Sequence, residues 1–301
     1  MNQTPAFSMA SVTRAARAAL QWRLLLLWAL WMLAPALILA LPAWQLLSAN
    51  LDYSVHAPAL ARALDMTALS DLLAIHERSE HTFTLAGALA LGATLLMSPM
   101  LSGMAATAAH APQAPGFAPR APGFAALLRG GAGYYWPMLR MLALGALPLG
   151  AAFMAGSAAI GAASAYLTTV SAVGDAALPV TLAPVVMVLL MGLVAASLDA
   201  GRAFLAADPH QRSALAAWLS GCALLARHPL AALGSYVGIS IAGLALAALL
   251  SLARANTAGV DALGFAGALL LTQAAVVTIG WVRSARLFAL VSLARARSAK
   301  A

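Results

Sequence analysis

Six long apolar stretches constrain this chain more than any other feature of its sequence. A helix that crosses a bilayer needs about 20 mostly apolar residues, and six segments meet this requirement with at most one charged residue each. They predict membrane-spanning helices at approximately 24–47, 83–107, 134–166, 176–200, 229–252 and 263–285. We therefore expect an all-α integral membrane protein, a bundle of six transmembrane helices in which residues 1–301 form a single polytopic membrane domain.

The composition excludes the common classes of soluble protein. Hydrophobic residues make up 63% of the chain and charged residues only 9%, whereas a water-soluble domain carries about 25% charged residues. A soluble enzyme, a disordered chain and a nucleic-acid-binding domain are therefore all excluded. The net charge of +8 has a simpler explanation in the lipid bilayer, because membrane proteins concentrate arginine and lysine in their cytoplasmic loops.

The distribution of charge predicts how the chain is threaded. With six spans both termini lie on one side, and that side receives fourteen of the seventeen basic residues: Arg14, Arg17, Arg23, Arg120, Arg129, Arg140, Arg202, Arg212, Arg227, Arg283, Arg286, Arg295, Arg297 and Lys300. The other side receives seven of the nine acidic residues: Asp52, Asp65, Asp71, Glu77, Glu80, Asp175 and Asp261. This asymmetry predicts a multi-pass protein of a bacterial-type cytoplasmic (inner) membrane with both termini in the cytoplasm.

Short amphipathic helices are expected where the chain enters the membrane from the cytoplasmic side. Before the first span, Val12, Ala16, Ala19 and Leu20 form an apolar helical stripe. In segment 208–228, Asp208 and Pro209 are an N-cap and first-turn signal. The stripe that follows consists of Leu215, Trp218, Leu219 and Cys222. We expect each helix to lie in the interface and to be followed by a turn and a span.

The layout also suggests three tandem helical hairpins, formed by spans 1–2, 3–4 and 5–6. A shared need for an interfacial anchor before each odd-numbered span would produce the same layout without any repeat. Between the spans, residues 48–81 form the longest extracytoplasmic loop, and 108–133 form a cytoplasmic linker rich in proline.

No catalytic constellation or cofactor-binding motif is visible in the sequence. The segment from His76 to His81 contains Glu80 and is a weak candidate for metal binding. Its two histidines are five residues apart, however, which does not match the zinc motif in which two histidines share one helical face. A solvated loop is the alternative interpretation. The pattern therefore indicates a protein that is not an enzyme.

Five charged residues fall at one predicted depth near the cytoplasmic ends of three spans. They are Arg140 in span three, Asp199 and Arg202 in span four, and Arg283 and Arg286 in span six. One interpretation is a site for an anionic group, such as a phospholipid headgroup, or for a partner. The other is positive-inside anchoring with one structural ion pair. Near the middle of the membrane the main strongly polar side chain is Gln273, which favours a role in helix–helix contact.

Three functions remain compatible with the sequence. The first is a non-catalytic membrane scaffold or assembly factor, whose partner would be another envelope protein. The second is a permease-type transport subunit energised by a soluble ATPase. In support of the second, Ala216-Ala217, Gly221 and Pro229 resemble the coupling loop of ABC importers, without its leading glutamate and with a shorter glycine-to-proline spacing. The third is an anionic-lipid-handling protein that uses the arginine cluster.

Overall fold

The computed structural model confirms the all-helical class and the presence of six long apolar helices that could cross a membrane. The structure describes residues 9–51, 80–110, 122–167, 173–208, 213–257 and 262–298. Six helices in this part of the chain are long and apolar enough to cross a membrane. They are α2 (Trp22–Leu51), α5 (Glu80–Ala109), α6 (Phe124–Leu167), α7 (Val173–Ala207), α9 (Pro229–Ala255) and α10 (Ala262–Ser298). Two shorter helices, α1 (Met9–Ala18) and α8 (Ala214–Arg227), complete the described elements.

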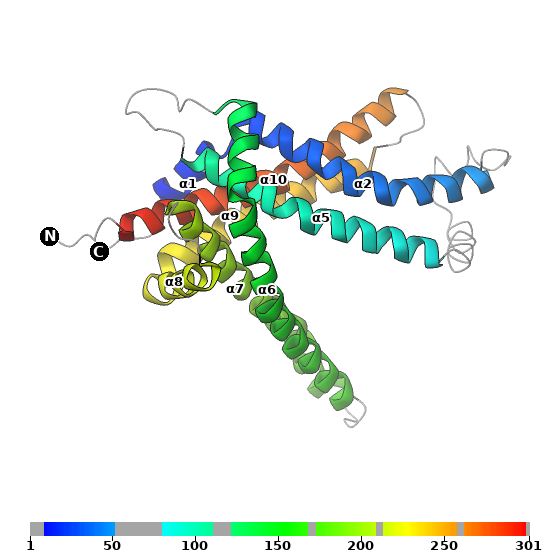
Figure 1. Ribbon diagram of the computed structural model, residues 1–301. Helices are drawn as coiled ribbons and strands as arrows, with labels where there is room; N and C mark the ends of the chain where they lie inside the picture. Colours follow the sequence, from blue (N-terminus) through cyan, green and yellow to red (C-terminus); the bar gives the residue numbers. More distant parts are fainter. Residues whose placement is uncertain are drawn as a thin grey trace.

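The long helices form three hairpins that spread apart from a common centre (Figure 1). The hairpin of α2 and α5, the hairpin of α6 and α7, and the hairpin of α9 and α10 point in three different directions. The helices within each hairpin pack along one another, and α5 also packs extensively on α6. The hairpin layout predicted from the sequence is thus present, while a common origin of the three units stays a hypothesis.

The helices converge at the end of the molecule where α1 begins and α10 ends, and we call this part the hub. Nearly all of the large buried side chains lie here, and they form one cluster. Its most deeply buried members include Leu24, Leu101, Met104, Met138, Met141, Leu198, Leu224, Leu290 and Val291. Away from the hub most buried side chains are alanines, and large apolar residues such as Leu147, Leu189 and Leu263 are exposed. This exposure suits a hydrocarbon surrounding and not water.

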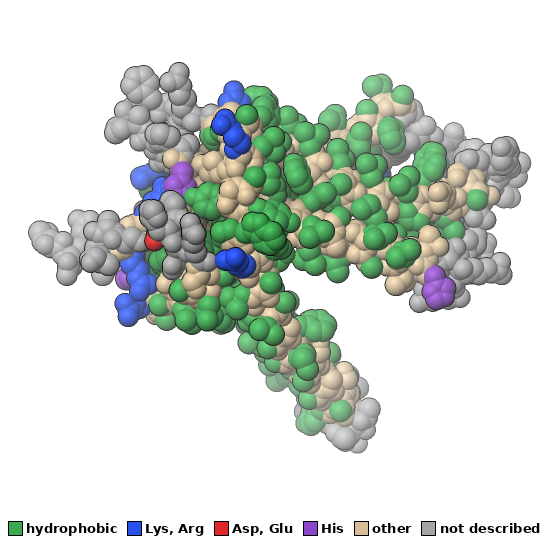
Figure 2. Space-filling view, viewed as in Figure 1, with side chains coloured by type: hydrophobic (Ala, Val, Ile, Leu, Met, Phe, Trp, Pro, Cys, Tyr) green, Lys and Arg blue, Asp and Glu red, His purple; other side chains and the backbone are tan. Residues whose placement is uncertain are grey.

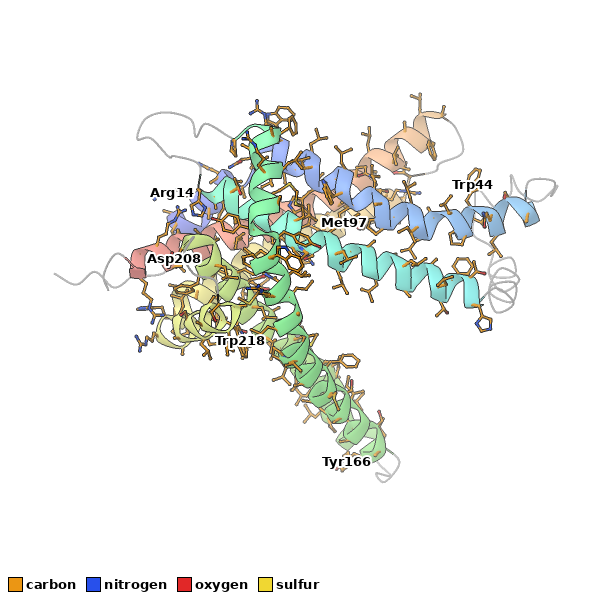
Figure 3. The ribbon with its side chains drawn as sticks, viewed as in Figure 1. Arg14, Trp44, Met97, Tyr166, Asp208 and Trp218 are labelled. Carbon is orange, nitrogen blue, oxygen red and sulfur yellow. The ribbon has the colours of Figure 1, made fainter. Side chains whose placement is uncertain are left out.

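The distribution of charged and aromatic side chains also distinguishes the hub from the hairpins. The arginine side chains visible in Figure 2 gather mainly at the hub, whereas the hairpins present apolar surface. Figure 3 places Arg14 and Asp208 at the hub, and Trp44 and Tyr166 near the far ends of their helices. Tryptophan and tyrosine are common at the membrane–water boundary, so both positions are typical of an aromatic belt.

The first short helix packs on the hub through its small residues. Ala15 and Ala19 are buried, while Arg14 and Arg17 are exposed. The indole Nε1 of Trp281 on α10 donates a hydrogen bond to the carbonyl of Ala16 at 2.8 Å. The predicted stripe is therefore shifted: Leu20 is exposed, and the alanines face the protein.

The second short helix begins later than its predicted capping signal. The N-cap of α8 is Ser213, whose Oγ accepts a hydrogen bond from the backbone N–H of Ala216. Asp208 follows the end of α7, and Pro209 lies outside the described residues. The face toward the protein is also different from the predicted stripe, because Leu215 and Leu219 are exposed while Ala217 and Gly221 are buried.

The segment before the third span contains no turn. The helix α6 runs without interruption over 44 residues, a length of about 66 Å, so it extends beyond the hydrocarbon core, which is only about 30 Å thick. Gly131 of α6 allows close contact with α5. A Cβ atom at Gly103 would lie 2.9 Å from the carbonyl oxygen of Gly131, and one at Gly131 would lie 2.8 Å from Cγ of Met104. The described part of the predicted 108–133 linker is thus largely helical from Phe124 onward.

The close contact of α8 with α7 yields a test of this packing. A Cβ atom at Gly221 would lie 2.6 Å from the backbone nitrogen of Gly201. Gly221→Ala is therefore expected to lower the free energy of unfolding by about 1–3 kcal/mol, the usual cost of overpacking. Thermal unfolding in detergent measures the effect. The matched control is Gly238→Ala on α9, where a Cβ would meet no atom within 4 Å; equal stability of the two variants would contradict the packing described.

Candidate functional site

Four of the five charged residues singled out in the sequence line one cavity of about 290 Å³ in the hub. Asp199 and Arg202 reach it from α7, and Arg283 and Arg286 reach it from α10. Each pair is three residues apart, so both members project from the same side of their helix. We call this the central cavity. All six long helices contribute to its wall.

The remaining predicted member, Arg140, does not belong to the cavity. Its side chain is exposed on α6, while Leu142 and Leu149 of the same helix line the wall. Two residues along an α-helix correspond to a rotation of about 200°, which accounts for the different directions of Arg140 and Leu142. Residues that were predicted to lie at one depth in the membrane therefore do not all face the same cavity.

Each arginine of the cavity is held by a different partner. The Nη1 of Arg202 donates to Oδ1 of Asp199 at 2.5 Å. The guanidinium of Arg283 lies 5.9 Å from the ring centre of Trp28. That of Arg286 lies 4.5 Å from the ring centre of Tyr236, and its Nη1 donates to the tyrosine hydroxyl at 3.2 Å. The aromatic rings attract the guanidinium groups through cation–π contact without neutralising them.

The charges of the cavity do not balance. Three arginines and one aspartate line it, and Asp199 forms an ion pair with Arg202. The negative charge of Asp199 attracts Arg283, whereas Arg202 and Arg286 repel it. Positive charge at membrane depth is costly unless it meets a counter-charge or water. The cavity is therefore suited to an anion.

Two buried polar groups of the wall residues have no hydrogen-bond partner among the described residues. Trp28 is 4% exposed, and its indole Nε1 is buried and unpaired, as is Nε of Arg286. The half-buried Ser98 and Ser102, one turn apart on α5, line the same cavity. Buried donors of this kind are normally paired, so they indicate a ligand with several acceptor oxygens.

The cavity opens to the surface of the molecule beside its apolar wall. Leu95 of α5 lines the cavity and is 44% exposed, and the side chain of Arg283 is exposed as well. Leu142, Leu149 and Leu198 add further apolar lining. The site thus combines a cationic part with an apolar part that reaches the outer surface of the helices.

The depth of the cavity follows from the helices that form it. Asp199 lies eight residues before the end of α7, and Ser102 lies seven residues before the end of α5. At 1.5 Å per residue these positions are about 10–12 Å from the hub ends of their helices. The headgroup region of a bilayer is about 5–8 Å thick on each side. A membrane surface at the hub ends of α5 and α7 would place Asp199 and Ser102 close to the boundary between headgroups and hydrocarbon.

The other predicted residues stand apart from this site. Gln273 is half-buried on α10 outside the cavity and forms no hydrogen bond within the described part of the chain. His76 and the side chain of Glu80 lie outside the described residues, and His81 is exposed at the start of α5. Within the described ranges, no group of three or more histidine, cysteine, aspartate or glutamate residues could hold a metal ion.

Sequence reasoning missed Trp28, Tyr236, Ser98 and Ser102. Trp28 and Tyr236 lie about two turns inside their helices from the hub ends and line the same cavity as the arginines, and their place near the cytoplasmic ends of the predicted spans was an available signal. The two serines carried no comparable signal, because serine is common in apolar helices. No protein-family model, curated protein or solved structure matches the chain.

Proposed function

We propose that this membrane protein binds an anionic phospholipid, with the phosphate of the headgroup in the central cavity. The observation that carries the proposal is the set of three arginines from two helices with a single aspartate to balance them. Arginine is suited to phosphate because its planar guanidinium presents several donors to the phosphate oxygens at once.

The form of the cavity favours a lipid over a small soluble anion. Its polar groups lie near the depth of the headgroups, while Leu95 and Leu149 extend its wall along the apolar surface of α5 and α6. A phospholipid has the same division, with charge at one end and acyl chains at the other. The hydroxyls of Ser98 and Ser102 and the Nε1 of Trp28 would supply further hydrogen bonds to the headgroup.

The aspartate has a distinct role in this proposal. Because Asp199 pairs with Arg202, it leaves Arg283 and Arg286 as the cations that face the ligand. It also limits the positive charge that the hub carries when no lipid is bound. Asp199 is therefore a positioning residue for Arg202 and an electrostatic competitor of the ligand.

A scaffold for another envelope protein and a transport subunit driven by a soluble ATPase stay predictions from the sequence. No contact among the described residues favours either over lipid binding. The proposed membrane is a bacterial-type cytoplasmic membrane, and the proposed topology has the hub on its cytoplasmic side. The topology is supported by the arginines gathered at the hub (Figure 2).

The topology predicts which residues a membrane-impermeant maleimide reaches in intact spheroplasts. In a Cys222→Ala background, which removes the single native cysteine, Ala49→Cys should be labelled from outside because Ala49 is exposed at the far end of α2. Arg17→Cys, at the hub, should be labelled only after the membrane is permeabilised. The reverse pattern would contradict the proposed orientation.

Lipid binding predicts a specific loss in native mass spectrometry of the purified protein with added phosphatidylglycerol. Arg283→Ala combined with Arg286→Ala should reduce the bound fraction at least about tenfold, because charge-assisted hydrogen bonds contribute roughly 1.5–3 kcal/mol each and 1.4 kcal/mol corresponds to a factor of ten. Asp199→Asn should bind at least as well as the wild type, since it removes the competing negative charge.

The matched control is Arg140→Ala, which removes an arginine outside the cavity. It should leave the bound fraction unchanged. Equal losses for Arg140→Ala and for the double variant would show that the lipid is attracted only by overall charge, and the proposal would then fail. Phosphatidylcholine serves as the lipid control and should bind weakly to all variants.

A further inference from the structure

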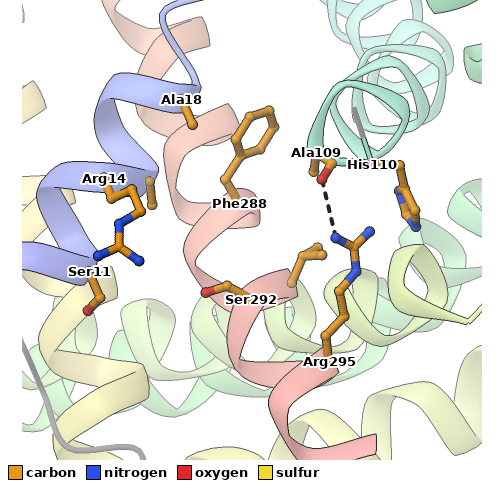
Figure 4. A pocket seen from close by; sticks show the side chains of 10 residues that line it. Ser11, Arg14, Ala18, Ala109, His110, Phe288, Ser292 and Arg295 are labelled. Carbon is orange, nitrogen blue, oxygen red and sulfur yellow. Dashed lines mark hydrogen bonds between the residues drawn. The ribbon is translucent and has the colours of Figure 1, made fainter. Parts of the chain in front are cut away.

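A second cationic pocket lies at the hub, between α1, the end of α5 and the last turns of α10 (Figure 4). Its volume is about 440 Å³. Three basic side chains line it from three different segments: Arg14 from α1, His110 after α5, and Arg295 from α10. We call this the terminal pocket.

The donors of the terminal pocket suit the same chemistry as those of the central cavity. Arg14 forms no hydrogen bond or ion pair within the described part of the chain. Arg295 donates to the carbonyl oxygen of Ala109 at 3.4 Å, a contact drawn in Figure 4. The Nδ1 of His110 is 2.7 Å from the carbonyl oxygen of Ala106, which leaves Nε2 for another partner. No acidic residue lines the pocket.

One face of α5 runs through both sites. Ser98, Ser102 and Ala105 line the central cavity, and Ala109 lines the terminal pocket. Spacings of three and four residues place successive side chains on the same face of a helix. The stripe thus consists of small side chains that end at the terminal pocket.

A matching stripe on α10 connects the same two sites. Arg283 and Leu287 line the central cavity, and Val291 and Arg295 line the terminal pocket. These four residues are spaced four apart, with an arginine at each end and apolar residues between them. The helices α5 and α10 are in contact, so the two stripes belong to one interface.

The barrier between the two sites is about one helical turn thick. Ala105 and Leu287 line one site, and the residues four positions further along, Ala109 and Val291, line the other. Four residues correspond to about 6 Å along a helix. Ala105, Leu287 and Val291 are all buried, so the barrier is apolar and closed in this structure.

We propose that the terminal pocket is a second site for the same phosphate-type headgroup, which reaches it from the central cavity along the facing stripes of α5 and α10. The inference rests on the proposed function, because the central cavity is the first of the two sites. It extends that function from holding an anionic lipid to presenting its headgroup at the hub end of the protein. Free phosphate from the water is the other source of the same chemistry.

The experiment uses the full chain reconstituted into phosphatidylcholine vesicles with a phosphatidylglycerol probe that carries a diazirine in its headgroup. After photolysis, mass spectrometry maps the adducts on peptides from the two sites. In the wild type we expect adducts at both. In Arg14→Ala combined with Arg295→Ala, the terminal adduct should fall at least about tenfold while the central adduct is retained. In Arg283→Ala combined with Arg286→Ala, both adducts should fall.

Three results would overturn the inference in distinguishable ways. A central adduct without a terminal one would remove the second site and leave the proposed function intact. A terminal adduct that persists in the Arg283/Arg286 variant, and that inorganic phosphate displaces, would show loading from water and not from the central cavity. The absence of both adducts from the wild type would remove the proposed function and the second site together.

Two further variants test whether a lost adduct reflects only the removal of charge or a failure to fold. Arg17→Ala, on the exposed face of α1, removes a neighbouring charge without touching the pocket and should retain both adducts. Arg283→Gln combined with Arg286→Gln, which keeps side chains of similar length, replaces the alanine pair if that pair does not fold. The midpoint of thermal unfolding in detergent establishes that each variant is folded before its adducts are compared.

Discussion

Six apolar helices converge at the hub around three arginines and a single aspartate. This excess of positive charge determines what the central cavity can bind. Arg283 and Arg286 line the central cavity from α10, a helix that packs on α1, α7 and α9. Aromatic rings hold both guanidiniums, and the single aspartate is engaged by Arg202. The cavity thus keeps its cations in place and unneutralised, which is the arrangement of a binding site for an anion.

The hub and the hairpins divide the remaining tasks. In the hub, contacts between small residues bring backbones together, as where Gly103 meets Gly131 and where Gly201 meets Gly221. Such approaches allow helices to pack closely where lipid offers no hydrophobic driving force between them. Beyond the hub the helices expose large apolar residues and carry few buried contacts. The hairpins therefore present apolar surface to the bilayer, and the hub holds the charged side chains that line the two pockets.

Most of the fold could be predicted from the sequence because a bilayer imposes a simple rule on helix length and charge. The six spans followed from long apolar runs with at most one charged residue each, and the cluster of Asp199, Arg202, Arg283 and Arg286 followed from their shared predicted depth. The depth of a residue along a helix does not show which way its side chain points around the helix. Arg140 was therefore grouped with residues that it does not contact. Before span three the chain continues as one helix, in which Gly131 permits a close crossing with α5; a sequence does not show which partner a glycine faces.

An electron cryomicroscopy structure of the protein in nanodiscs that contain phosphatidylglycerol would show directly whether a phosphate-type headgroup occupies the central cavity. We expect headgroup density with phosphate oxygens about 3 Å from guanidinium nitrogens of both Arg283 and Arg286 and acyl chains running past Leu95. A cavity that holds only water or an acyl chain, with both arginines turned away, would contradict it.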